Sequence, residues 1–251
     1  MSKISDLTAT WRRGTIKTSR QLAGEGYDPQ LLRAYSKSGW IELLSYGAYK
    51  LRGDHVEWPG GLFALQQTPE CQIHAGGRTA LELQGFAHYL RSGAGSVEIF
   101  GRIEDRLPAW FNTSFPSPQI NFHKTNSLDY SVDGSFRDYD VANVPLKISD
   151  PELGIMEMAY LIPKKHSLEE TNLIMESLTT IRPLLLQRLL ESCKSVKVNR
   201  IVLYLAELNK HRWFNQLDIS KIRLGSGKRE IVKNGKLDKK YGITVMKESN
   251  R

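Results

Sequence analysis

Residues 18–52 read TSRQLAGEGYDPQLLRAYSKSGWIELLSYGAYKLR and decide the fold expected for the first part of the chain. Thr18 is a favourable N-cap for a short helix, and the glycine-containing segment 24–26 ends that helix within two turns. Asp28-Pro29 combines an N-cap residue with proline at the first helical position. We therefore expect a second helix over residues 28–37, joined to the first by a tight turn.

Two β-rich runs follow this helix, over residues 40–44 and 48–51, and a short turn with Gly47 separates them. Such runs around a glycine turn are typical of a β-hairpin. Residues 4–12 carry apolar side chains at helical spacing and predict a further helix in front of the pair. Three short helices followed directly by a hairpin are the order of a winged helix-turn-helix, in which the second helix of the motif enters the major groove of DNA.

The expected recognition helix carries Gln30, Arg33 and Lys37 at three- and four-residue spacing. One face therefore presents an amide that can pair with a base and two cations. The hairpin would be the wing, whose side chains meet phosphates. The alternative is that the helix has an ordinary solvated face. The residues that this pattern predicts to contact DNA are Gln30, Arg33 and Lys37 of the helix and Tyr46, Lys50 and Arg52 of the hairpin.

The rest of the chain predicts an α+β protein with a second, larger unit. Ser167 and Glu170 have the spacing of a capping box. Apolar runs between 217 and 245, separated by glycine turns, predict a closing antiparallel β-meander. Helices are expected at 57–67, from 76, from 150, from 167, from 183 and over 196–208, and strands at 71–74, 96–100 and 119–123.

A domain boundary is expected in the small-residue segment 91–95. It gives a winged-helix DNA-binding domain with its extension over 1–92 and a C-terminal domain over 93–251. The C-terminal domain is expected to be a mixed α/β unit with a helical layer and an antiparallel sheet. A length of 251 residues accommodates two such domains.

The net charge of +8 is unevenly distributed. Residues 1–53 carry 9 Lys and Arg against 4 Asp and Glu, residues 54–193 carry 11 against 18, and residues 194–251 carry 15 against 5. Two basic ends around an acidic middle fit a protein that contacts a polyanion, because neutralised phosphates supply most of the sequence-independent affinity for nucleic acid. The alternative is a basic protein without a polyanionic partner.

The second basic region lies in a glycine-containing hairpin near the C-terminus. Its cations are expected to meet a phosphate backbone or an acidic partner, and a merely solvated hairpin is the alternative. The residues of this predicted basic surface are Arg223, Lys228, Arg229, Lys233, Lys236, Lys239 and Lys240.

No arrangement of residues in the sequence supports catalysis. Gly76-Gly77 before a helix could suggest phosphate binding, but the three spaced glycines of dinucleotide-binding proteins are absent, so a tight structural turn is expected. Residues 225–229 resemble the end of a phosphate-binding P-loop, yet Ile222 replaces its first glycine and Arg229 replaces its Ser or Thr. We therefore predict no enzyme and no cofactor.

The cysteines and histidines do not predict a metal site. Cys71 and His74 have a plausible spacing for ligands, but no second pair follows at the distance of a zinc site, and the other histidines are scattered. Cys71 and Cys193 are expected to be buried thiols in a reducing compartment. The N-terminal residues lack the apolar core of a secretory signal, and no apolar run is long enough for a bilayer. The expected location is the cytoplasm.

Short motifs along the whole chain form a specific combination, although none is decisive alone. They are Thr18-Ser19-x-x-Leu22-Ala23, Ser38-Gly39-Trp40, Gly47-Ala48-Tyr49, Gly76 to Gly85 with His88-Tyr89-Leu90, Leu178-Thr179-Thr180-x-Arg182-Pro183, Ser195 to Val198, Leu224 to Arg229 and Tyr241-x-Ile243-Thr244-Val245. In this combination the chain resembles the AbiE-type antitoxins, the AbiEi family of type IV toxin-antitoxin systems. It departs from the family pattern at Met246, where proline is usual.

The resemblance implies an antitoxin and DNA-binding transcriptional autorepressor of an abortive-infection operon, which serves phage defence. Its winged helix would bind double-stranded DNA at inverted repeats in its own promoter, through residues 18–21, 30–37 and 46–52. Its C-terminal domain would counter a nucleotidyltransferase-like toxin without a stable complex. The alternative is a non-enzymatic interaction module whose basic C-terminal domain binds RNA or an acidic partner protein directly. A nuclease or transferase is a third hypothesis, without support from the residues.

Overall fold

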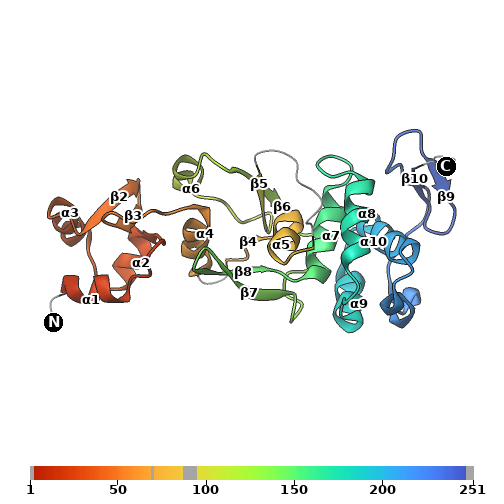
Figure 1. Cartoon of the computed structure of the whole chain (residues 1–251), viewed down its shortest axis with the longest axis horizontal. Coiled ribbons are helices and arrows are strands. Elements are labelled where there is room, and N and C mark those ends of the chain that lie inside the picture. Colours follow the sequence, from red (N-terminus) through yellow and green to blue (C-terminus); the bar gives the residue numbers. More distant parts are fainter. Residues whose placement is uncertain (1–2, 69–70, 87–94, 247–251) are drawn as a thin grey trace.

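The computed structural model describes residues 3–68, 71–86 and 95–246. The chain is elongated, and its segments follow one another along the long axis (Figure 1). The N-terminal helices and hairpin form one end, a mixed sheet lies next to them, a helical layer comes after the sheet, and a short hairpin lies at the other end. The predicted α+β class with a winged helix-turn-helix in front is confirmed.

The N-terminal unit has the element order of a winged helix. Its elements are α1 (Lys3–Thr10), β1 (Lys17–Thr18), α2 (Ser19–Gly24), α3 (Pro29–Lys37), β2 (Ile41–Ser45) and β3 (Ala48–Leu51). The three strands form one antiparallel sheet in the order β1-β3-β2. A cluster of buried side chains from the helices and the hairpin holds the unit together: Leu7, Trp11, Leu22, Leu32, Ile41 and Leu51.

Both helices of the motif begin where the sequence predicts, because each has a side-chain cap. The Thr18 hydroxyl accepts a hydrogen bond from the Gln21 backbone N–H at 3.2 Å, and the Gln21 side-chain oxygen accepts one from the Thr18 N–H at 2.8 Å. Asp28 caps α3 by accepting a hydrogen bond from the Leu31 N–H at 2.8 Å. These side chains satisfy backbone donors that have no partner inside the helix.

Replacing Thr18 with alanine removes the cap of α2 and should lower the free energy of unfolding by about 0.5–2 kcal/mol. Chemical denaturation followed by circular dichroism measures this change. Thr179→Ala is the control, because Thr179 is exposed and its hydroxyl makes no hydrogen bond to a described residue. Equal stability of the two variants would show that the capping box does not stabilise the winged helix.

A five-stranded sheet forms the middle of the molecule, in the order β6-β5-β4-β8-β7. The pairs β5 with β6 and β4 with β8 are parallel, and the other two pairs are antiparallel. The strand expected over 71–74 is shorter and later than predicted, since only His74 and Ala75 pair with neighbours. The elements of this unit are α4 (Trp58–Gln66), β4 (His74–Ala75), α5 (Gly77–Leu83), β5 (Ser96–Gly101), α6 (Ala109–Ser114), β6 (Gln119–Lys124), β7 (Phe136–Val141) and β8 (Val144–Ser149).

The middle sheet contains strands from both sides of the expected domain boundary. β4 comes before residue 93 and its neighbour β5 comes after it. The boundary residues 91–94 themselves lie outside the described part of the chain. One cluster of buried side chains extends from Ile16 and Ala48 of the winged-helix unit to Ile99 and Ile148 of the sheet. The winged helix and the sheet therefore share a hydrophobic core.

The predicted helical layer follows the sheet and consists of α7 (Pro151–Leu161), α8 (Leu168–Ser177), α9 (Pro183–Ser192) and α10 (Val196–Leu208) (Figure 1). Helix α7 is buried on almost all sides, which fits its apolar composition. The Ser167 hydroxyl caps α8 by accepting a hydrogen bond from the Glu170 N–H at 3.0 Å. The expected return hydrogen bond, from the Ser167 N–H to the Glu170 side chain, is wrong. The Glu170 carboxylate contacts His166 and Arg78 instead.

The β-meander expected over the last part of the chain is wrong except at its end. Asp218 accepts hydrogen bonds from the N–H and the hydroxyl of Ser220, and this local pairing competes with a strand ladder. The segment instead forms η1 (Arg212–Gln216) and η2 (Ile219–Lys221), which are 3-10 helices. The strands β9 (Lys236–Asp238) and β10 (Ile243–Val245) pair in antiparallel order, and Arg229 forms an isolated parallel bridge with Ile243. The apolar residues that suggested strands pack against the helical layer: Leu217, Ile222 and Ile231.

Candidate nucleic-acid interface

Helix α3 presents the three predicted base-contacting residues on one exposed face. Gln30, Arg33 and Lys37 are exposed, while Leu32 of the same helix is buried in the core. Their side chains make no hydrogen bond or ion pair with any residue that the structure describes. α3 lies at the N-terminal end of the elongated molecule (Figure 1). Free amide and guanidinium groups at this spacing are able to pair with base edges in a major groove.

The β2–β3 hairpin forms the wing, but its predicted contact residues differ in availability. Tyr46 in the turn is 95% exposed. Lys50 donates a hydrogen bond to the Asp54 carbonyl oxygen at 2.8 Å, and its Nζ lies 3.2 Å from a Glu42 carboxylate oxygen. Arg52 is exposed, and its guanidinium reaches the Gly39 carbonyl oxygen at 3.5 Å. Tyr46 and Arg52 are therefore better placed than Lys50 to contact phosphates.

Most of the predicted DNA-binding residues in the range 18–21 stabilise the fold. Thr18 and Gln21 form the capping box, and the Gln21 amide also donates a hydrogen bond to the Ala64 carbonyl oxygen at 2.6 Å. Ser19 is partly buried, and its N–H donates to the Gly47 carbonyl oxygen at 2.9 Å. Arg20 is exposed, with no side-chain partner among the described residues. Of these four predicted residues, Arg20 alone has a side chain available to a ligand.

Polar contacts fix the winged helix against the middle sheet. The Gln21 amide bonds to Ala64 of α4, and the Arg12 guanidinium donates a hydrogen bond to the Asn143 carbonyl oxygen at 3.0 Å. Together with the shared core, these contacts set the direction in which α3 points. Helix α3 belongs to a unit that is fixed against the sheet by direct contacts.

The seven residues of the predicted C-terminal basic surface are all exposed. Lys240 forms an ion pair with Glu207 of α10, while the other six have no ion-pair partner among the described residues. Hairpin β9–β10 lies at the end of the molecule opposite α3 (Figure 1). The two predicted cationic surfaces are thus separate, with the acidic middle segment between them.

The glycine pair before α5 faces two buried carboxylates rather than an open anion site. The Gly77 N–H donates a hydrogen bond to Glu157 at 2.7 Å, and the Arg78 N–H donates one to Glu98 at 2.9 Å. A Cβ added to Gly76 would lie 2.4 Å from a Glu157 carboxylate oxygen, so the close approach requires glycine. The expected structural role of this turn is confirmed by these contacts.

These carboxylates belong to a buried network that links the sheet to the helical layer. Glu157 is completely buried and also accepts hydrogen bonds from the Ser149 hydroxyl at 2.8 Å and pairs with His74 Nε2 at 2.7 Å. Glu98 pairs with His166 Nε2 at 2.6 Å. The sequence does not reveal this network, because its partners are far apart in the chain and their residue types occur throughout the protein. Its described carboxylates are satisfied by protein donors, which is typical of a structural role.

His166 makes protein stability depend on pH. Burial lowers its pKa, but hydrogen bonds to Glu170 and Glu98 outweigh burial and raise the pKa to about 9. Because an unfolded histidine has a pKa of roughly 6.5, this stabilisation is complete below that pH and is lost as the pH rises through the folded value. His166→Asn should therefore lower the free energy of unfolding most at about pH 6, and progressively less as the pH rises to about 9.5.

Urea unfolding of the wild type and of His166→Asn across this pH range measures the difference. His55→Asn is the matched control, since His55 is 88% exposed at its side chain. A cost of His166→Asn that stays constant with pH would contradict a charged His166 in the folded state.

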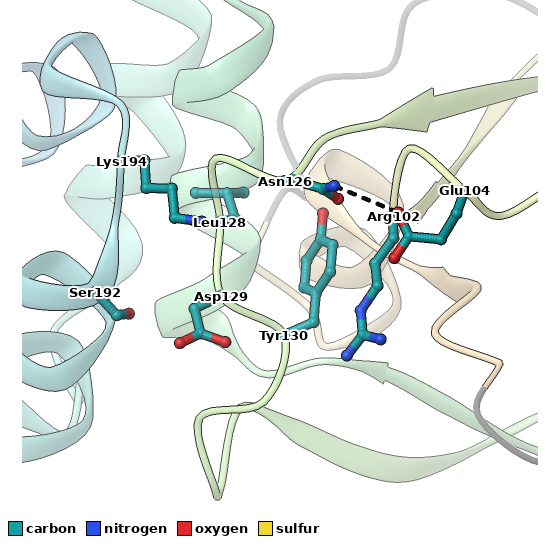
Figure 2. A pocket seen from close by; sticks show the side chains of 8 residues that line it. All are labelled: Arg102, Glu104, Asn126, Leu128, Asp129, Tyr130, Ser192 and Lys194. Atoms are coloured by element: carbon teal, nitrogen blue, oxygen red, sulfur yellow. Dashed lines mark hydrogen bonds between the residues drawn. The ribbon is translucent and has the colours of Figure 1, made fainter.

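A hollow with side chains from both the loops of the sheet and the helical layer has mixed charge. It has a volume of about 260 Å³ and lies between the loops after β5 and β6 and the connection from α9 to α10 (Figure 2). Arg102 and Lys194 face it together with Asp129 and Glu104, and Asp129 accepts hydrogen bonds from Ser131. Ser192 also lines it, and its hydroxyl donates a hydrogen bond to the Leu189 carbonyl oxygen at 3.2 Å.

The described residues contain no group of three or more His, Cys, Asp or Glu side chains that could hold a metal ion. Cys193 is buried as expected, but Cys71 is partly exposed, because the strand predicted around it does not form. In the described part of the chain, no helix has both the length and the apolarity to span a membrane.

Two family models together match nearly the entire chain. The model described as a transcriptional regulator, AbiEi antitoxin N-terminal domain, matches residues 1–92, and the one described as a transcriptional regulator, AbiEi antitoxin, type IV TA system, matches residues 94–246. The chain belongs to the AbiEi antitoxin family. This AbiEi protein is therefore a transcriptional regulator and antitoxin of a type IV toxin-antitoxin system, as its sequence motifs predicted, and the family assignment indicates a regulator rather than an enzyme.

A solved structure shares the fold of this AbiEi protein. The crystal structure of the RV2827C protein from Mycobacterium tuberculosis aligns with a TM-score of 0.63 at 14% sequence identity, and the alignment covers 96% of this chain and 88% of that chain. At this identity the likeness concerns the fold alone. No curated protein matches the sequence.

Proposed function

We propose that this AbiEi antitoxin represses its own operon by inserting α3 into the major groove at inverted repeats in the operon's promoter. The observation that carries the proposal is the exposed face of α3, where Gln30, Arg33 and Lys37 have no partner among the described residues. Arg20 precedes this helix in the sequence, and Tyr46 and Arg52 follow it in the wing. All three side chains are exposed, so they supply the phosphate contacts.

A reporter gene behind the operon's own promoter tests repression in cells. Expression of the full-length protein should lower the reporter signal several-fold, and Arg33→Ala should restore it. Arg106→Ala is the matched control, because it removes an exposed cation of the middle segment and leaves α3 intact. A reporter signal that does not change when the wild-type protein is expressed would overturn the proposal.

We also infer that the part of the chain beyond the winged helix counters a nucleotidyltransferase-like toxin without forming a stable complex. This inference is supported by the antitoxin family and by the distance of the helical layer from α3. Co-expression with the toxin should restore growth even for Arg33→Ala, and the toxin should not co-purify with the antitoxin. Co-purification in fixed proportion would instead favour the second candidate function, in which the basic C-terminal surface binds an acidic partner protein directly.

A further inference from the structure

The loop from Leu224 to Arg229 is held by a buried cation that has no acidic partner. Arg200 of α10 is only 3% exposed. Its Nε donates a hydrogen bond to the Leu224 carbonyl oxygen at 2.7 Å, and its Nη1 donates to the carbonyl oxygens of Gly227 at 2.7 Å and Gly242 at 3.2 Å. Buried charges in proteins are normally paired with an opposite charge. The positive charge of Arg200 has no such counter-charge among the described residues.

The contacts of Arg200 determine which groups the loop turns outward. In a trans peptide the C=O and the N–H point in opposite directions. Since the carbonyls of Leu224 and Gly227 point to Arg200, the N–H groups of Gly225 and Lys228 point away from it. Neither N–H, nor those of the two residues between them, bonds to a described residue. The loop thus offers backbone N–H donors that have no partner among the described residues, as in backbone anion sites.

Glycine makes this loop conformation possible. Gly225 has a φ of +61° and Gly227 a φ of +78°, in the region that other residues rarely adopt. A Cβ at Gly225 would also lie 3.1 Å from a Val196 methyl group. The backbone of Arg229 is fixed in turn, because its N–H donates to the Gly242 carbonyl oxygen at 2.9 Å and its carbonyl oxygen accepts from the Thr244 N–H at 3.0 Å. The conformation of the loop is therefore fixed by its glycines and by backbone hydrogen bonds.

Further cations lie on the loop and beside it. Lys228 and Arg229 are exposed on it. Lys197, one turn before Arg200 on α10, donates hydrogen bonds to the carbonyl oxygens of Tyr160 and Ile162. Burial, together with the charges of Lys164 and Arg229, lowers the pKa of Lys197 to about 8. An anion bound at the loop would relieve this repulsion.

We propose that the outer face of the Leu224–Arg229 loop binds a phosphomonoester, the compact dianionic group at the end of a nucleotide or of a nucleic-acid strand. Its oxygens accept hydrogen bonds from the Gly225 and Lys228 N–H groups and from the side chains of Lys228 and Arg229. Arg200 is a positioning residue that also supplies positive charge behind the loop. A compact dianion fits better than a phosphodiester chain, because it concentrates two negative charges where the loop, Lys228 and Arg229 offer several donors.

The test is titration of the full-length protein with inorganic phosphate, AMP and adenosine at constant ionic strength, followed by amide NMR. Phosphate and AMP should shift the Gly225 and Lys228 amide signals, and adenosine should not. Arg229→Gln should weaken phosphate binding by about tenfold or more. Lys233→Gln, which removes an exposed cation of the same region, should change it by less than about twofold. Arg33→Ala should leave phosphate binding unchanged, so failure of this site is separable from failure of the repressor proposal.

Two oligonucleotides of one sequence, with a 5′-phosphate or a 5′-hydroxyl, distinguish the sources of the phosphate. Tighter binding of the phosphorylated strand than of AMP supports a strand end as the ligand, and tighter binding of AMP supports a free nucleotide. The proposal is overturned if phosphate and AMP leave the loop amides unmoved at millimolar concentration. It is equally overturned if Arg229→Gln binds phosphate as well as Lys233→Gln, or if only the diester backbone binds, with no preference for the 5′-phosphate.

Discussion

Replacing Arg33 with alanine is expected to abolish most of the preference of this AbiEi antitoxin for its own operator. The guanidinium lies on the exposed face of α3 and has no partner among the described residues. A bidentate contact between an arginine and a guanine contributes roughly 1–3 kcal/mol of discrimination. The operator affinity should therefore fall about 5- to 150-fold, while affinity for scrambled DNA falls much less. Fluorescence anisotropy with both DNAs measures the two affinities.

Arg106→Ala is the control for the loss of one positive charge, since Arg106 is exposed in the middle of the chain. It should leave the ratio of operator to scrambled affinity unchanged. If Arg33→Ala lowered both affinities equally, Arg33 would contact phosphates rather than bases. If it altered neither, the assignment of α3 as the recognition helix would be wrong.

Replacing Glu157 with alanine is expected to destabilise the protein by roughly 3 kcal/mol or more, because each buried polar group left without a partner costs about 1–3 kcal/mol. Glu157 is completely buried and accepts hydrogen bonds from the Gly77 N–H and the Ser149 hydroxyl, besides its contact with His74. Its removal leaves three buried polar groups without a partner at the junction of sheet and helical layer. Urea denaturation followed by tryptophan fluorescence measures the free energy of unfolding.

Glu169→Ala is the matched control, because Glu169 is exposed in the first turn of α8. It should change the free energy of unfolding by less than about 0.5 kcal/mol. A cost below about 1 kcal/mol for Glu157→Ala would mean that the network does not hold the two layers together.

The winged helix could be predicted from the sequence because its signals are local. Thr18, Asp28-Pro29 and the glycine turns each specify a helix end through contacts within three residues. The same local reasoning failed after α10. There, Asp218 bonds to Ser220 and turns the chain, so that apolar residues with strand-like spacing reach the core from 3-10 helices.

The candidate site was predictable in part. The exposed residues of α3 follow from helical spacing, but the capping role of Gln21 and the internal contacts of Lys50 depend on the folded chain. The role of Arg200 could not be predicted either, because nothing in the sequence shows that a cation of α10 contacts the carbonyl oxygens of a loop that begins 24 residues later. Contacts of this kind arise from tertiary packing, which residue types and spacing alone do not determine.

A repressor of this kind must bind the operon's own promoter specifically through α3 and the wing. The direct test is binding of the full-length protein to a labelled fragment of that promoter and to scrambled DNA, at low and at physiological salt. We expect tighter binding to the promoter, by on the order of a thousandfold, with both affinities falling steeply as salt rises. Equal affinity for the two DNAs at both salt concentrations would contradict it.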